Sequence, residues 1–175
     1  MFSNNDIVLY GTEGVCRVSS TVEKNFAGRI VKYYVLKPIY KENSTVFIPT
    51  DNELLLSKVR QILSEDEVND IIQSMPDESP MWIDDNNARK AKYKEIILSG
   101  NPRELVRLIK ALYLHQQEQQ LNGKKFHIAD ERLLKDAEKL LYDEFAVALK
   151  ITPQQVLPLI LKQTQSGARP CGNQN

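Results

Sequence analysis

The 175-residue sequence has only two cysteines, Cys16 and Cys171, and its 23 basic residues are balanced by 23 acidic ones. Two distant cysteines form neither a disulfide framework nor a metal-ligand spacing, which favours a reducing compartment. Zero net charge excludes a chain that is basic throughout, so any contact with nucleic acid requires local segregation of charge. The N-terminus lacks the basic start and apolar run of a signal peptide, and no run is long enough to span a bilayer. These features predict a cytoplasmic protein that does not associate with membranes.

The sequence also lacks the residue patterns of an enzyme. No nucleophile or metal-ligand spacing accompanies either His115 or His127, and we interpret both as surface or partly buried histidines. The glycine-containing segment YGTEG, residues 10–14, lacks the Lys-Ser/Thr pair of a phosphate loop and predicts a hairpin turn. We therefore predict no catalytic residue, no metal, no cofactor and no small-molecule substrate.

The first 50 residues have the composition of β-strands. Short runs rich in β-branched and aromatic residues are bounded by Gly, Ala-Gly, Pro38 and Pro49, and they occupy residues 7–9, 15–18, 29–36 and 44–48. Four or five short strands within about 55 residues predict a small, strongly bent sheet or barrel.

From residue 51 onward the pattern is helical. Ser64 and Glu67 form a capping box, and a helix over 86–99 is predicted to end at Gly100. Asn101 and the proline after it start the next helix, to about 120. A long helix over 129–149 and a short last helix from 153 follow. The polar residues 163–175 predict a disordered tail.

The chain is therefore predicted to be an α+β protein. Residues 1–60 form a small Tudor/SH3-like β-barrel, and residues 61–162 form an all-α domain of about five helices. No heptad repeat or other self-association signal is visible, which favours a monomer acting within a larger complex.

Charge changes sign within the helical part. Residues 61–87 hold eight acidic residues and no Lys or Arg, whereas residues 88–110 hold seven basic residues and two acidic ones. Within about a turn and a half of one helix lie the basic residues Arg89, Lys90, Lys92 and Lys94. Such a cluster can neutralise phosphates, and Lys124 and Lys125 extend it if their loop lies on the same side. The same cluster can equally be an ordinary solvated helix face.

The single tryptophan, Trp82, has two interpretations. A lone tryptophan is most often an anchor in a core or between domains. An exposed one beside basic residues can instead be an apolar wedge against an unstacked base step, as in some minor-groove proteins. The residues themselves leave both open and favour the core.

The chain resembles the CarD family (CarD/CdnL-like transcription regulators). The resemblance is carried by DIVLYGTEGVCRV, KYYVLKPIY and STVFIPTDN in the first part, and by ARKAKYKEIILSGNPRELVRLIKALYL and DERLLKDAEKLLYDEFAVAL in the second. It implies an N-terminal Tudor-like domain that binds the RNA polymerase β subunit by strand-edge pairing. It also implies a helical domain that contacts promoter DNA at the upstream edge of the transcription bubble, where a tryptophan wedges into the minor groove and helps to hold the open complex.

The resemblance also suggests site residues. For polymerase binding these are Lys24, Phe26, Thr45 and Phe47; for DNA binding they are Trp82, Arg89, Lys90, Lys92, Lys94, Lys124, Lys125 and Arg132. Phe47 stands where the family has a basic contact, so the salt bridge expected there is either replaced by an apolar contact or absent. In the family, the tryptophan stands at a fixed distance before the glycine that ends the helix. Counted back from Gly100, that position is Asn86, and Trp82 lies about one helical turn further out. One extra turn would move its side chain by about 5–6 Å. A protein–protein adaptor on the polymerase, with no DNA contact, is the alternative function.

Overall fold

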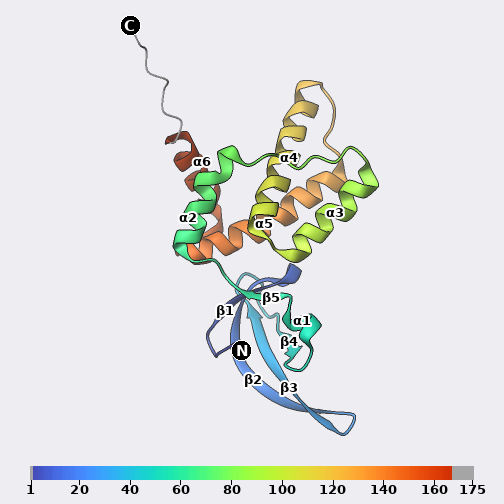
Figure 1. Cartoon of the computed structure of the whole chain (residues 1–175), viewed down its shortest axis with the longest axis vertical. Coiled ribbons are helices and arrows are strands. Elements are labelled where there is room, and N and C mark those ends of the chain that lie inside the picture. The colour runs from blue at the N-terminus through green and yellow to red at the C-terminus, as the bar shows by residue number, and fades with distance from the viewer. Residues whose placement is uncertain (1, 167–175) are drawn as a thin grey trace.

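The computed structural model describes residues 2–166, and its first part is an antiparallel five-stranded sheet (Figure 1). The strands follow the order β4-β3-β2-β1-β5, with the bounds β1 (Ile7–Tyr10), β2 (Gly14–Phe26), β3 (Arg29–Pro38), β4 (Val46–Pro49) and β5 (Val59–Gln61). The two outer strands, β4 and β5, do not pair with each other, so the sheet is open and not the closed barrel predicted from the sequence. The α+β class is confirmed.

The strand β5 was missed by the sequence analysis, which read the chain as helical throughout after residue 51. It pairs antiparallel with β1, placing Leu9 opposite Arg60 and Tyr10 opposite Val59. The predicted turn at residues 10–14 is confirmed, because β1 and β2 pair on either side of a short 3-10 helix, η1 (Gly11–Glu13). A one-turn helix, α1 (Glu53–Leu56), lies between β4 and β5.

Five further helices follow the sheet. They are α2 (Glu65–Ser74), α3 (Asn86–Ser99), α4 (Pro102–Leu121), α5 (Ile128–Leu149) and α6 (Pro153–Ser166), with a 3-10 turn, η2 (Met75–Asp77), after α2. Helix α6 continues past the boundary predicted at residue 162. The rest of the predicted tail, residues 167–175, lies outside the described residues.

Local capping signals place the helix ends where the sequence predicted them. The Ser64 side chain accepts from the backbone of Glu67, whose carboxylate accepts from the Ser64 N–H at 2.8 Å. These hydrogen bonds to Ser64 lower the pKa of Glu67. The Asn101 side chain accepts from the first turn of α4, and Gly100 ends α3 with φ 63°.

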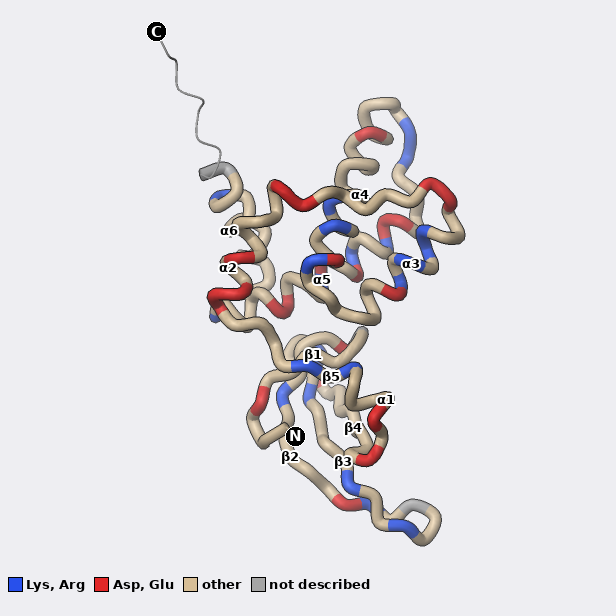
Figure 2. The backbone as a smooth tube through the Cα atoms, in the orientation of Figure 1, with Lys and Arg blue, Asp and Glu red and all other residues tan. Residues whose placement is uncertain are grey.

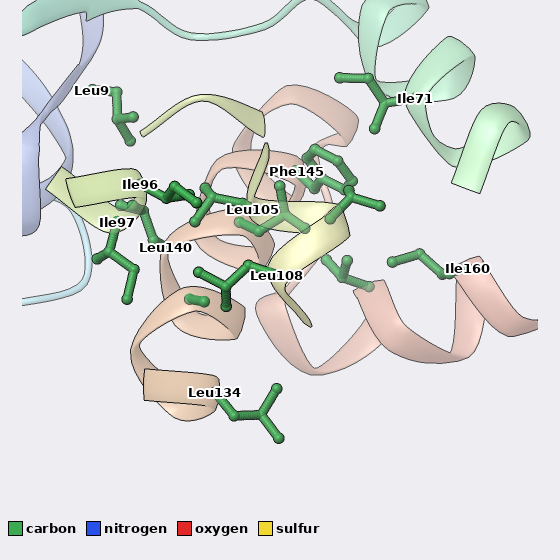
Figure 3. Close-up of a cluster of buried hydrophobic side chains, with 14 of the residues drawn as sticks. Leu9, Ile71, Ile96, Ile97, Leu105, Leu108, Leu134, Leu140, Phe145 and Ile160 are labelled. Carbon is green, nitrogen blue, oxygen red and sulfur yellow. The ribbon is translucent and has the colours of Figure 1, made fainter. Parts of the chain in front are cut away.

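The hydrophobic core of the helices includes residues of the sheet. Leu9 of β1 packs with Ile96, Ile97 and other helical residues, and Figure 3 shows it pointing towards them. The contact is close at Gly100, where an added Cβ would lie 2.7 Å from Leu9 Cδ2. Because side chains alternate along a strand, the neighbouring Val8 instead joins the separate core of the sheet.

A buried ion pair also joins the sheet to the helices. Arg60 of β5 donates to both carboxylate oxygens of Glu144 on α5, at 2.5 and 2.8 Å, and to the carbonyl of Gly100 at 2.7 Å. Glu144 is fully buried and also accepts from the backbone N–H of Leu63 at 3.0 Å. These four charge-assisted hydrogen bonds fix β5 and the residue Leu63 against α5 and the end of α3.

We expect Glu144→Ala to lower the free energy of unfolding by about 1–3 kcal/mol, because it leaves the Leu63 N–H and part of the Arg60 guanidinium without acceptors. Urea unfolding of the full chain measures this loss. The control is Asp136→Ala, an exposed carboxylate on the same helix, which should change stability by less than about 0.5 kcal/mol. Equal stabilities for the two variants would contradict a stabilising role for the Arg60–Glu144 ion pair.

Candidate functional site

Trp82 lies in the irregular segment between η2 and α3 and is half-buried. Its indole stacks on His115 of α4, with ring centroids 4.1 Å apart and an interplanar angle of 28°. The guanidinium carbon of Arg89 lies 4.4 Å from the indole centroid, and Nε1 donates to Asp84 at 2.9 Å. Helix α3 begins at Asn86, as predicted, so Trp82 does not lie on an extra turn of this helix.

The segment that carries Trp82 is fixed by basic side chains of α4. Lys110 donates to three backbone carbonyls within residues 75–78, at 2.7 to 3.2 Å. Arg107 donates to a further carbonyl of the segment at 3.0 Å, and Arg103 forms an ion pair with Glu78 at 3.1 Å. Part of the positive charge that follows Trp82 in the sequence therefore binds the acidic segment before it. Figure 2 shows the red positions before α3 and the blue ones on α3 and α4.

A tyrosine of α3 also binds the segment that carries Trp82. The Tyr93 hydroxyl, in a side chain with no exposed surface, donates to the backbone carbonyl of Met81. Burial raises the pKa of Tyr93 to about 12, so the hydroxyl keeps its hydrogen at neutral pH. The residue next to Trp82 is thereby fixed to α3.

Arg89 is buried, although it lies within the basic cluster of α3. It is 4 % exposed and pairs with Asp130 of α5 through Nη2 at 2.8 Å and Nε at 3.1 Å. Its Nη1 donates to the carbonyl of Ile83 at 2.8 Å. Arg89 thus joins α3, α5 and the Trp82 segment, and we remove it from the predicted phosphate contacts because its donors are already occupied.

The other basic residues of this region divide by position. A pocket of about 450 Å³ between α3 and α5 is lined by Lys90, Lys94, His127, Ile128, Ala129, Arg132, Leu133 and Asp136. Its three cations, Lys90, Lys94 and Arg132, have no hydrogen-bond or ion-pair partner among the described residues. The pocket is therefore the part of the predicted cluster where positive charge is free to bind an anion.

Three further residues were predicted to bind DNA. Lys124 and Lys125 lie close to this pocket in the chain, whereas Lys92 does not line it. Lys124 and Lys125 are exposed in the loop that leads into α5. The Cα of Lys125 lies within about 8 Å of that of His127, because only Phe126 separates them in the chain. Lys92 instead pairs with Glu95 on its own helix at 3.1 Å and does not line the pocket.

The sheet carries a second candidate surface, which we call the β4 platform: Lys24, Tyr33 and Phe47. The Lys24 Nζ lies 3.5 Å from the centroid of the Phe47 ring, and the Tyr33 ring meets Phe47 edge-on at 6.5 Å. Phe47 is 42 % exposed. Thr45 is exposed just before β4, and Phe26 is the last residue of β2. Among the described residues no strand pairs with the outer side of β4, which leaves its backbone open to pairing.

The sequence analysis did not predict the buried ion pair between Arg89 and Asp130, which joins α3 to α5. Asp130 precedes Leu133, Leu134 and Ala137 at helical spacing, so it falls on the apolar face of α5. Arg89 precedes Tyr93 and the apolar end of α3 in the same way. A charged residue on an apolar face is the signal that predicts a buried ion pair. The two histidines are as expected, since His115 is partly buried and His127 is exposed.

Two structural absences hold within residues 2–166. No group of three or more His, Cys, Asp or Glu side chains there could hold a metal ion. No helix in that range combines the length and the apolar character needed to cross a membrane.

Family models match both parts of the chain. The model of the CarD-like/TRCF RID domain matches residues 2–60, and the model of the CarD C-terminal domain matches residues 58–160. The two matches meet at β5, the strand that bonds to α5 through Arg60. A comparison with curated proteins finds no significant match.

Proposed function

The chain belongs to the CarD family of non-enzymatic, RNA polymerase-interacting transcription factors, and from this premise we propose how it acts. The sheet binds the β subunit of RNA polymerase. The helical part binds promoter DNA at the upstream edge of the transcription bubble, and the two contacts together stabilise the open complex. The protein acts in the cytoplasm as a monomer within the polymerase complex.

The observation that carries the polymerase contact is the open edge of β4. An edge strand can receive a strand of the partner, with backbone hydrogen bonds giving affinity and flanking side chains giving selectivity. The β4 platform flanks that edge with one cation and two aromatic rings. Because Phe47 is apolar, the partner strand needs an apolar side chain opposite Phe47. It also needs an acidic side chain within reach of the Lys24 ammonium, which lies over the Phe47 ring. Thr45, exposed just before β4, extends this contact, whereas the register places Phe26 at the far end of β2, opposite Arg29.

The double variant Lys24→Ala/Phe47→Ala is expected to weaken binding of the full chain to the β subunit by about tenfold or more, because two of the three side chains of the platform are lost. Isothermal titration measures the affinity. The matched control, Lys135→Ala/Leu98→Ala, removes one lysine and one exposed apolar residue from the helical part and should bind as the wild type does. Binding that is unchanged in the platform variant would contradict the proposal.

The DNA contact is supported by the free cations beside α5. Lys90, Lys94 and Arg132 have no partner among the described residues, and Lys124 and Lys125 are exposed nearby. Such cations bind phosphates without regard to base sequence and with strong salt dependence. Trp82 supports this surface from its docked position, as the anchor of the segment that leads into α3.

An adaptor without DNA contact is the second candidate function. It is favoured by one observation: Arg103, Arg107 and Lys110 bind the segment before α3, which reduces the positive surface that the sequence suggested. Salt separates the two functions. DNA binding through several phosphates falls steeply between low and moderate salt, whereas an apolar protein contact does not.

A further inference from the structure

The pocket between α3 and α5 combines a cationic wall with an aliphatic one. Lys90 and Lys94 stand one helical turn apart on α3, and Arg132 lines the pocket from α5. Ile128 is 67 % exposed and packs against neither hydrophobic core, yet it lines this pocket beside Leu133. A large exposed apolar side chain next to three unpaired cations has no structural role in the fold.

We propose that this pocket is a preformed binding site for a phosphate group attached to a sugar. The three cations bind the phosphate, and the Ile128 and Leu133 side chains contact the carbon face of the sugar. The ligand is either a nucleotide unit of the DNA backbone or a free sugar phosphate. The first of these sources rests on the proposed function, and the second does not.

The walls of the pocket are held in place before any ligand binds. Arg89 and Asp130, each adjacent in sequence to a pocket residue, form the buried ion pair that joins α3 to α5. His127 Nδ1 accepts from the backbone N–H of Ala129 at 3.2 Å. The hydrogen of the neutral ring is then on Nε2, which can donate to a phosphate oxygen. Little reorganisation is therefore needed on binding, which favours affinity.

Charge and size fit the same class of ligand. The pocket contains three cations and one carboxylate, Asp136, so it remains positive when His127 is neutral. A phosphate monoester carries about −1.5 to −2 charges at neutral pH. The volume of about 450 Å³ lies within the range of about 300–1,000 Å³ that holds small ligands, and a bare phosphate would fill only part of it. A sugar phosphate uses both walls.

The test is a titration of the full chain followed by amide chemical shifts, with inorganic phosphate, ribose 5-phosphate, or chloride at equal ionic strength. We expect saturable shifts at residues 127–133 and at Lys90 with both phosphates and not with chloride. Ribose 5-phosphate should bind more tightly than inorganic phosphate, and Ile128→Ala should remove that difference. Shifts that chloride reproduces would overturn the proposal.

Two variants separate the pocket from its surroundings. Lys90→Ala/Arg132→Ala is expected to weaken ribose 5-phosphate binding by about tenfold or more, while the surface substitutions leave the fold intact. The matched control, Lys92→Ala/Lys135→Ala, removes one exposed, ion-paired lysine from each of the same two helices, neither of which lines the pocket, and should keep the affinity for ribose 5-phosphate. Equal losses in both variants would show a diffuse basic surface and no discrete site.

A short DNA duplex distinguishes the two sources of the ligand. If the duplex displaces ribose 5-phosphate, the source is the DNA backbone, and the pocket variant should reduce the salt slope of DNA binding by about 1 per lost phosphate contact. If ribose 5-phosphate binds and the duplex does not displace it, the pocket proposal is supported with a free sugar phosphate as the ligand. The proposed DNA contact at this pocket is then wrong. If only the duplex binds and the pocket variant retains that binding, the pocket proposal is overturned while the proposed function survives.

Discussion

Asp130→Ala lowers the free energy of unfolding by about 3–5 kcal/mol, because it leaves the Arg89 guanidinium buried without a counter-charge. Arg89 is only 4 % exposed, so it cannot become hydrated without opening the contact between α3 and α5. Denaturant unfolding of the full chain measures the loss. The double variant Arg89→Met/Asp130→Leu should recover much of it, because it removes both charges and keeps the volume.

The control for this prediction is the next residue of the same helix. Glu131 forms an exposed ion pair with Lys135 at 2.9 Å, so Glu131→Ala should reduce stability by less than about 1 kcal/mol. Fluorescence adds a local readout, since Trp82 is the only tryptophan and Arg89 lies against it. Asp130→Ala should alter the emission of the folded protein, and Glu131→Ala should not. A loss near that of Glu131→Ala would show that Arg89 is hydrated.

Trp82→Ala is expected to reduce stability by about 2–4 kcal/mol, less than a fully buried tryptophan would, because the side chain is half-buried. His115→Ala should reduce it by a smaller amount. The double-mutant cycle between them should give a coupling energy of about 0.5–1.5 kcal/mol, the value of a stacked aromatic pair. The same cycle with Leu114→Ala, the exposed neighbour of His115, should give a coupling close to zero.

The contacts of Trp82 also decide between an anchor and a wedge. Stacking on His115, the guanidinium of Arg89 and the hydrogen bond to Asp84 together stabilise the docked indole by about 1.5–4 kcal/mol. Stacking of the indole on a base would stabilise the undocked position by about 1–3 kcal/mol, but unstacking the base step costs about a few kcal/mol in free energy. We therefore expect the indole to stay docked if the helical part binds DNA.

Open-complex lifetimes test this choice with the same variants. An anchor predicts that Trp82→Ala and His115→Ala change the lifetime in the same direction, since both loosen the segment before α3. A wedge predicts opposite behaviour, because His115→Ala frees the indole and Trp82→Ala removes it. A lifetime shortened by Trp82→Ala and lengthened by His115→Ala would contradict the anchor.

Local signals made the helices predictable from the sequence. The capping box at Ser64, the left-handed Gly100 and the Asn101 cap act through hydrogen bonds or backbone angles within a few residues. All the residues that form such a signal are near neighbours in the sequence, so the signal can be recognised without the structure. The predicted bounds of α3, α4 and α5 were accordingly correct to within a residue or two, whereas α6 continues four residues past its predicted end.

The features that were missed depend on partners far along the chain. The strand β5 has only three residues, and it is defined by pairing with β1, some 50 residues earlier. Arg60 gains its role from Glu144, 84 residues away, and Arg89 from Asp130, 41 residues away. Composition showed the change of charge sign at Trp82, but only the packing shows that Arg103, Arg107 and Lys110 bind the segment before α3.

The candidate DNA surface was predictable in part. Lys90, Lys94 and Arg132 were expected there and line one pocket, whereas Lys92 pairs within its own helix and Arg89 is buried. The charge pattern of the sequence indicated the basic residues of α3, and the packing of α3 on α5 selects among them. Ile128 and His127 had no signal in the sequence, because their place in the pocket depends on that packing.

The most direct test is the lifetime of a promoter open complex with the matching RNA polymerase. It compares no factor, the wild-type chain, the pocket variant Lys90→Ala/Arg132→Ala and the platform variant Lys24→Ala/Phe47→Ala. The wild type should lengthen the lifetime. The pocket variant should still bind the β subunit yet lose most of the effect, and the platform variant should lose both. A pocket variant that lengthens the lifetime as the wild type does would contradict DNA binding by the helical part.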